Sequence, residues 1–183
     1  MTNDLAGRLR VNWILWAAML ASTALYLVML GVVKGPDTPP DRFLALVVNA
    51  VGLAVAAASV AVPTLLWNTA RRTLRPVIEE VPDHEAEAGL FRDAVPTKRV
   101  ITQGAALLSE ALTRAHAPLI VAIAMSDAVS ILGFVLAFLG HPPLHWVPLY
   151  VLGVLLLLLR APLLKRLVRN LEAHFDAELT GLD

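Results

Sequence analysis

The sequence contains no cysteine among its 183 residues, so it has no disulfide, no thiolate metal ligand and no cysteine nucleophile. It is also poor in charge: only 16% of its residues are charged, and the formal net charge is zero. This balance gives no general attraction to nucleic acid. No phosphate-binding glycine loop, nucleophile elbow or His-Glu-x-x-His pattern occurs. We therefore expect a protein that is not an enzyme and that uses no metal and no cofactor.

Apolar residues are abundant instead. They make up 57% of the chain, and the mean hydropathy of +0.68 is too high for a soluble domain of this size. Four apolar stretches are predicted to cross a bilayer, at about 12–33, 43–67, 119–139 and 144–164. The uninterrupted part of the last ends at Leu159, and it reaches 164 because Arg160 can extend its charged group to the interface. Turns rich in glycine and proline join them in pairs. The sequence thus predicts an all-α polytopic membrane protein with four transmembrane helices in two hairpins, 1–67 and 117–164.

The longer polar segment, 68–116, separates the two hairpins. It begins with a basic cluster and continues with an acidic loop, which we interpret as solvated or as a divalent-cation site (Glu79, Glu80, Asp83, His84, Glu85, Glu87). From Lys98 onward, apolar residues recur at helical spacing (Ile101, Ala105, Leu108, Leu112, Ala115). This spacing predicts an amphipathic helix, which Pro118 would kink or break before the third span.

The tail, 165–183, begins as a second amphipathic helix. One side is apolar and the other is basic (Leu164, Leu167, Val168, Leu171, Phe175; Lys165, Arg166, Arg169). Such a helix tends to lie along an anionic leaflet. Of the 15 lysines and arginines, 12 fall in the N-terminal, middle and C-terminal segments, and Arg160 lies at the adjoining end of the fourth span; the exceptions are Lys34 and Arg42. We therefore expect the bacterial inner membrane, with both termini and the middle segment in the cytoplasm.

Asp127 is the anomaly of the third span. It lies roughly 12 Å along the helix from Leu119, near the middle of a ~30 Å apolar core. A charge at that depth costs roughly 2.5–3.5 kcal/mol, so we expect a neutral, protonated carboxyl. Four hydroxyl side chains are candidate hydrogen-bond partners: two at similar depth in the first span and two on the same helix (Ser22, Thr23, Ser126, Ser130). Arg160 is the only embedded cation that could pair with it.

Small residues mark the surfaces where helices can approach closely. In the second span Asn49, Gly52, Ala56, Ser59 and Pro63 recur on one face, and Gly133 follows Asp127 in the third span. Small side chains allow close contact between membrane helices. We predict helix packing at Gly52, Ala56, Ser59 and Gly133.

The segment Ser126-Asp-Ala-Val-Ser-Ile-Leu-Gly133-Phe-Val-Leu-Ala-Phe-Leu139 resembles the carboxylate-bearing helix of the rotor-ring c subunits (proteolipids) of rotary ATP synthases. In that family, as in the prediction here, a small-residue helix runs inward and the acid-bearing helix runs outward. The resemblance implies a proton carried by Asp127. The chain differs from the family in its extra first and fourth spans and its long link, 68–116.

Two hypotheses follow. In the first, the protein is a proton-linked membrane subunit in ion transport, with Asp127 as the proton-carrying group. In the second, it is a non-catalytic structural or assembly subunit of a larger membrane complex, with Asp127 as a hydrogen-bond link between helices. Both predict lipid contact, association with other membrane subunits or with itself, and no nucleic-acid partner.

Overall fold

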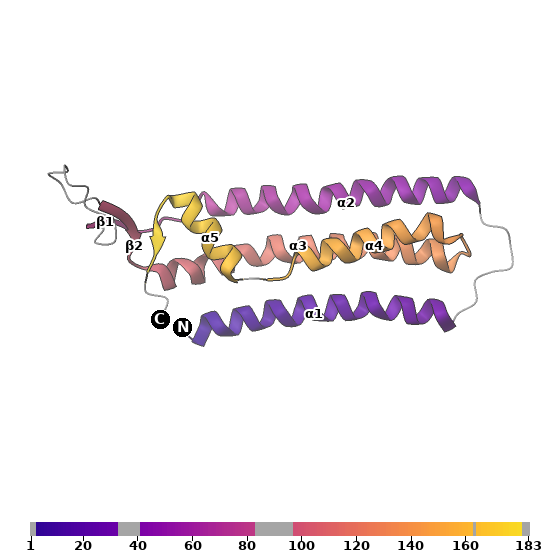
Figure 1. Cartoon of the computed structure of the whole chain (residues 1–183), viewed down its shortest axis with the longest axis horizontal. Coiled ribbons are helices and arrows are strands. Elements are labelled where there is room, and N and C mark those ends of the chain that lie inside the picture. The colour runs from indigo at the N-terminus through magenta and orange to yellow at the C-terminus, as the bar shows by residue number, and fades with distance from the viewer. Residues whose placement is uncertain (1–2, 33–40, 83–96, 163, 181–183) are drawn as a thin grey trace, which may run out of the picture.

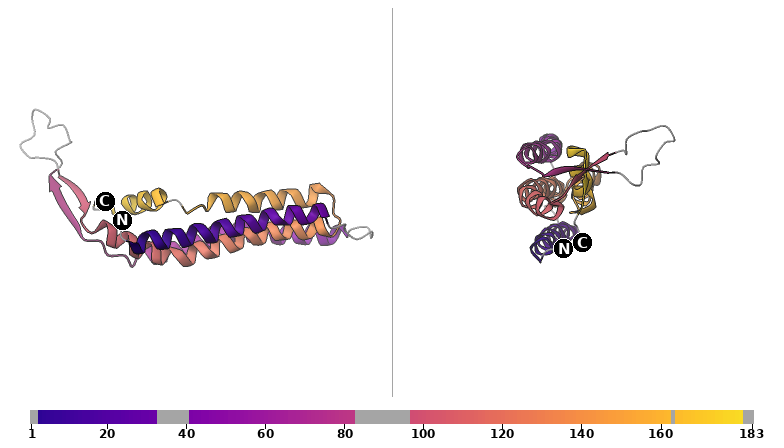
Figure 2. Two further views of the ribbon diagram at one scale, coloured as in Figure 1. Left: turned by 90° about the horizontal axis from the view of Figure 1, so that it is seen from below. Right: turned by 90° about the vertical axis from the view of Figure 1, so that its left-hand side faces the viewer.

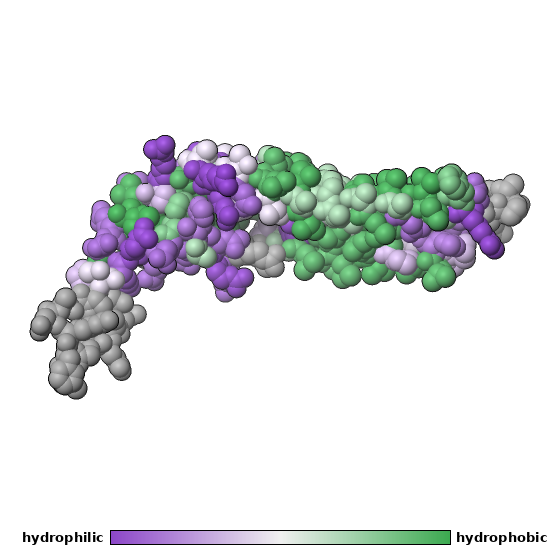
Figure 3. Space-filling view, turned by 90° about the horizontal axis from the view of Figure 1, so that it is seen from above, coloured by the Kyte–Doolittle hydropathy of each residue, from purple (hydrophilic) through white to green (hydrophobic). Residues whose placement is uncertain are grey.

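The computed structural model describes residues 3–32, 41–82, 97–162 and 164–180. Helices α1 (Asn3–Val32), α2 (Arg42–Arg71), α3 (Gly104–Phe138) and α4 (Pro143–Leu159) run side by side as an elongated bundle (Figure 1). Helix α5 (Leu164–Phe175), a small sheet and the beginning of α1 lie together at one end, which we call the polar end. Figure 3 shows an apolar surface over the bundle and a hydrophilic surface over the polar end.

Three of these helices, α1, α2 and α3, are long and apolar enough to cross a membrane. The chain is therefore a multi-pass membrane protein that contacts the lipid bilayer. Helix α4 is apolar but has only 17 residues, about 26 Å at 1.5 Å per residue, and it ends at Leu159 rather than at 164. Pro162 explains this end, because proline supplies no N–H and cannot continue the helical hydrogen bonding.

Helix α3 is the central element, because α1, α2 and α4 all pack against it. Seen along the bundle, α1 and α2 lie on opposite sides of α3 (Figure 2). Helix α2 packs against both α3 and α4 and buries one face of small residues (Ala45, Gly52, Ala56, Ser59, Pro63). The Ser59 hydroxyl donates to the Ala56 carbonyl oxygen within α2 at 2.7 Å, so its polar group is satisfied inside the interface.

Glycines bring the backbones together where α4 meets its neighbours. A Cβ atom on Gly133 would lie 2.7 Å from the Tyr150 nitrogen, and one on Gly153 would lie 2.2 Å from Ser130 Oγ. A Cβ atom on Gly52 would lie 2.7 Å from Leu149 Cδ2. Side chains at Gly133 and Gly153 would therefore separate α3 from α4, as expected for small residues at a membrane-helix interface.

The predicted amphipathic helix from Lys98 is wrong in its first turn. Thr97–Ile101 forms strand β2, and the helix begins at Gly104. Threonine, valine and isoleucine favour extended backbone because of their branched Cβ atoms, and this preference outweighs the helical spacing of Ile101. Helix α3 then continues without a break through Pro118 into the third span.

The chain is mostly helical rather than all-α, because a small sheet forms at the polar end. Strand β1 (Ile78–Pro82) pairs antiparallel with β2, and β3 (Glu178–Leu179) pairs parallel on the other side of β2. Glu79 and Glu80 of the predicted acidic loop lie in β1. Asp83, His84, Glu85 and Glu87 lie outside the described residues.

The apolar side of α5 packs against other parts of the protein. Leu171 is buried, and the other apolar residues of this side pack around the same core (Leu164, Leu167, Val168, Phe175). This core also contains Leu108 and Leu112 of α3 and Ile101 of β2. The apolar side of α5 therefore packs against α3 and the sheet, and the expected contact of this helix with an anionic leaflet stays a prediction.

Candidate functional site

Asp127 of α3 lies inside the bundle, with only 7% of its surface exposed. Its Oδ1 atom lies 3.0 Å from the Oγ1 atom of Thr23 in α1, and Thr23 is itself 1% exposed. The two residues are far apart in the sequence and lie at matching depth in helices that pack together. This contact joins α1 to α3 in the apolar part of the molecule.

The Thr23 hydroxyl has two oxygen neighbours but only one proton. The second neighbour is the carbonyl oxygen of Met19, 2.8 Å away, which can only accept. If the hydroxyl donates to Met19, a protonated Asp127 can donate to Thr23 Oγ1, and both protons then have an acceptor. An ionised Asp127 would instead compete with Met19 for the same proton. The geometry therefore fits the neutral carboxyl expected from the sequence.

Tyr150 of α4 completes this group of residues. Its hydroxyl is buried and donates a hydrogen bond to the carbonyl oxygen of Thr23. Sequence analysis missed Tyr150, although a tyrosine in an apolar helix needs a partner for its O–H. Thr23 thus receives contacts from α3 through its side chain and from α4 through its backbone. We call Thr23, Asp127 and Tyr150 the buried polar triad.

The other three predicted partners of Asp127 do not bond to it. The Ser22 hydroxyl donates to Met19 O at 2.9 Å, and the Ser126 hydroxyl donates to Ala122 O at 2.7 Å, each within its own helix. Serine commonly bonds to the preceding turn in this way. Ser130 Oγ has no hydrogen-bond partner among the described residues. Ser130 instead lies where α4 approaches most closely, opposite Gly153.

Further polar contacts hold α1 near the polar end. Asn12 Oδ1 and His116 Nδ1 lie 2.8 Å apart, and the Trp16 indole N–H donates to the Leu157 carbonyl oxygen at 2.8 Å. Among the residues of α1 whose burial is described, Asn12 and Thr23 are the two that are buried. Many of the large apolar side chains of α1 are exposed, and its buried side chains are polar.

The described residues contain no group of three or more His, Cys, Asp or Glu side chains able to hold a metal ion. Arg160, the one embedded cation considered for Asp127, donates instead to the Ser59 carbonyl oxygen of α2 at 2.9 Å. The buried polar triad can therefore do two things chemically. It can hold one proton on Asp127, and it can tie three helices together.

Comparison of the chain with protein families, with curated proteins and with solved structures finds no match in any of the three.

Proposed function

We propose that the protein is a non-catalytic structural or assembly subunit of the membrane, in which Asp127 is a hydrogen-bond link between helices. The observation that carries this proposal is the contact between Asp127 and Thr23, both buried within the bundle. A carboxyl that exchanges protons needs a route to water or to a partner surface. A buried carboxyl that bonds to a hydroxyl group of another helix instead stabilises the contact between the two helices.

The weak apolar packing of α1 explains why such a link is useful. Lipid chains are as apolar as leucine, so apolar contact alone gives little drive for α1 to leave the lipid and join α3. A hydrogen bond between membrane helices contributes about 0.6 kcal/mol on average and up to about 1.7 kcal/mol. Several such bonds along α1, at Asn12, Trp16 and Thr23, together favour the assembled bundle.

The proposal places the protein in a bacterial inner membrane, with the polar end in the cytoplasm and α4 as a short fourth span. The distribution of lysine and arginine supports this orientation, because the basic N-terminal, middle and C-terminal segments meet at the polar end (Figure 1). Large apolar side chains remain exposed along α1 and α2, including Leu25, Val28, Leu46 and Leu53. Lipid, other membrane subunits or a second copy of the chain would cover them.

The alternative is the proton-linked subunit implied by the resemblance to c subunits. The observation that favours it is the single proton that Asp127 can hold beside Thr23. In this alternative the contact with Thr23 must open, so that Asp127 can exchange its proton. The two roles make different demands on residue 127, because hydrogen bonding requires an amide or an acid whereas proton transfer requires the acid.

Replacement of Asp127 by asparagine and by leucine separates these roles. For a structural role, Asp127→Asn should keep the folded bundle, its co-purifying partners and any proton flux in reconstituted vesicles, whereas Asp127→Leu should loosen α1. Loss of proton flux in a folded Asp127→Asn protein would contradict the structural role and support the alternative. Purification in mild detergent that repeatedly yields a lone monomer would contradict the assembly role.

A further inference from the structure

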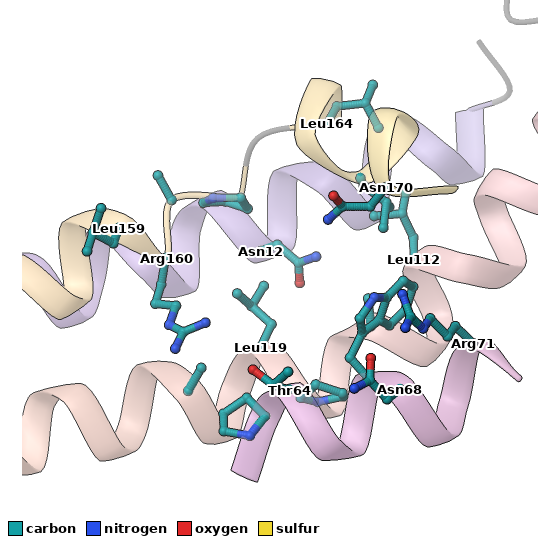
Figure 4. Close-up of a pocket in the computed structure, with 18 of the residues that line it drawn as sticks. Asn12, Thr64, Asn68, Arg71, Leu112, Leu119, Leu159, Arg160, Leu164 and Asn170 are labelled. Carbon is teal, nitrogen blue, oxygen red and sulfur yellow. The ribbon is translucent and has the colours of Figure 1, made fainter. Parts of the chain in front are cut away.

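A cavity of about 730 Å³ opens between the bundle and the polar end. All five helices contribute to its wall, together with the link 160–162 between α4 and α5 (Figure 4). A volume of this size lies within the usual range for a small-molecule site. None of the three residues of the buried polar triad lines this cavity.

The wall of the cavity is cationic. Arg71 at the end of α2 and Arg160 after α4 both line it, with His174 of α5 nearby, and none of the described lining residues is Asp or Glu. Figure 4 shows the two arginines reaching the cavity from different elements. The Arg71 side chain has no ion-pair partner among the described residues. The positive charge of Arg71 is therefore not balanced by a described carboxylate, and an anion in the cavity would balance it.

The rest of the wall is divided between polar and apolar groups. Asn12, Asn68 and Asn170 supply amide groups, and Thr64 supplies a hydroxyl group. Leucine, proline and tryptophan side chains supply apolar surface (Leu112, Leu119, Leu159, Pro63, Trp67). This combination suits an amphiphile, in which an anionic head and an apolar chain are covalently joined.

The depth of the cavity matches that of a lipid headgroup. Its lining residues lie where apolar stretches begin or end: Asn12 near the start of the first, Trp67 at the end of the second and Leu159 at the end of α4. Tryptophan is enriched at this level of a membrane. A lipid in the surrounding leaflet therefore carries its phosphate at the height of Arg71 and Arg160.

We propose that this cavity binds one anionic phospholipid of the cytoplasmic leaflet. Its phosphate lies toward the arginine side chains, its polar head contacts the asparagine amides, and its glycerol and upper acyl chain lie against the leucines. Arginine suits this role because its planar guanidinium donates two parallel hydrogen bonds to a phosphate. Helices α1, α2, α3 and α5 would thus share one lipid at the junction with the polar end.

Native mass spectrometry of the full chain in an uncharged detergent tests the proposal. We expect one phosphatidylglycerol to be retained per chain, and at least about fivefold weaker retention of phosphatidylcholine. Inorganic phosphate at millimolar concentration should not displace the lipid. Equal retention of the two lipids would contradict an anion site, and displacement by phosphate would show that the cavity takes the free anion rather than a lipid.

Three variants localise the binding. Arg71→Gln should weaken retention of phosphatidylglycerol about fivefold. The matched control Arg72→Gln removes the same charge from an exposed neighbour outside the cavity and should leave retention unchanged. Ala115→Phe fills the cavity without changing charge and should also weaken retention. Equal effects of Arg71→Gln and Arg72→Gln, or full retention by Ala115→Phe, would overturn the assignment.

Discussion

Arg160 donates a hydrogen bond from Nη2 to the carbonyl oxygen of Ser59, 2.9 Å away, and so joins the end of α4 to the buried face of α2. Ser59 lies four residues before Pro63, which has no N–H to donate to that carbonyl. Arg160 therefore replaces the helical donor that Pro63 removes. The proline in α2 and the arginine after α4 are two parts of one structural feature.

This relationship predicts a coupling between Arg160 and Pro63. Arg160→Met should lower the free energy of unfolding by about 1–3 kcal/mol, because it leaves the buried Ser59 carbonyl without this donor. The same change should cost less in a Pro63→Ala background, where the backbone of the substituted residue supplies the helical N–H. A double-mutant cycle, measured by unfolding in mixed micelles, gives the difference. Equal costs in the two backgrounds would show that Arg160 stabilises the protein in another way.

The link between α1 and α3 can be measured in the same assay. Thr23→Val preserves the shape of the side chain but removes its hydroxyl, and Asp127→Leu removes the carboxyl. Each should destabilise the bundle, and the coupling energy between them should be about 0.5–1.7 kcal/mol. Ser22→Ala is the matched control, since the Ser22 hydroxyl bonds only within its own helix. A coupling energy of zero would mean that the two groups do not interact.

The close contact of α3 with α4 depends on Gly153. A Cβ atom there would meet Ser130 Oγ at 2.2 Å and the Ser130 nitrogen at 2.5 Å. Because a backbone atom cannot rotate away, Gly153→Ala should lower stability by about 1–3 kcal/mol. Gly31→Ala is the control, because nothing lies within 4 Å of its added Cβ and alanine favours helix. A Gly153→Ala protein as stable as the control would contradict this packing.

The attachment of the C-terminal strand depends on Gly104. A Cβ atom at this position would lie 2.2 Å from the carbonyl oxygen of Thr180, directly after β3. Gly104→Ala should therefore loosen β3 from β2 and speed amide hydrogen exchange at Leu179 and Thr180. Hydrogen exchange followed by mass spectrometry measures this change. Unchanged protection of the C-terminal peptide, with α3 intact, would contradict the contact.

The sequence alone predicted the membrane character, the helical bundle and the unusual position of Asp127. A helix that crosses the membrane needs apolar side chains over its whole length in the bilayer, and the thickness of the bilayer sets that length. Both can be read from the sequence. The small sheet was not predicted, because five-residue strands are too short for a clear periodic pattern and Ile101 fitted a helical one. The end of α4 was placed too late because Arg160 was expected to snorkel and so to let the span continue to 164, whereas the helix ends at Leu159.

Sequence also determined the depth of each group along its helix, since rise per residue is constant. It therefore placed both Ser22 and Thr23 near Asp127. Only the tertiary structure decided between them, because the rotation of α1 about its own axis turns Thr23 toward α3 and leaves Ser22 bonded within its helix. Only the tertiary structure likewise shows the partners of Tyr150 and Arg160. Their partners are backbone carbonyls of other helices, and the packing of those helices alone brings such groups together.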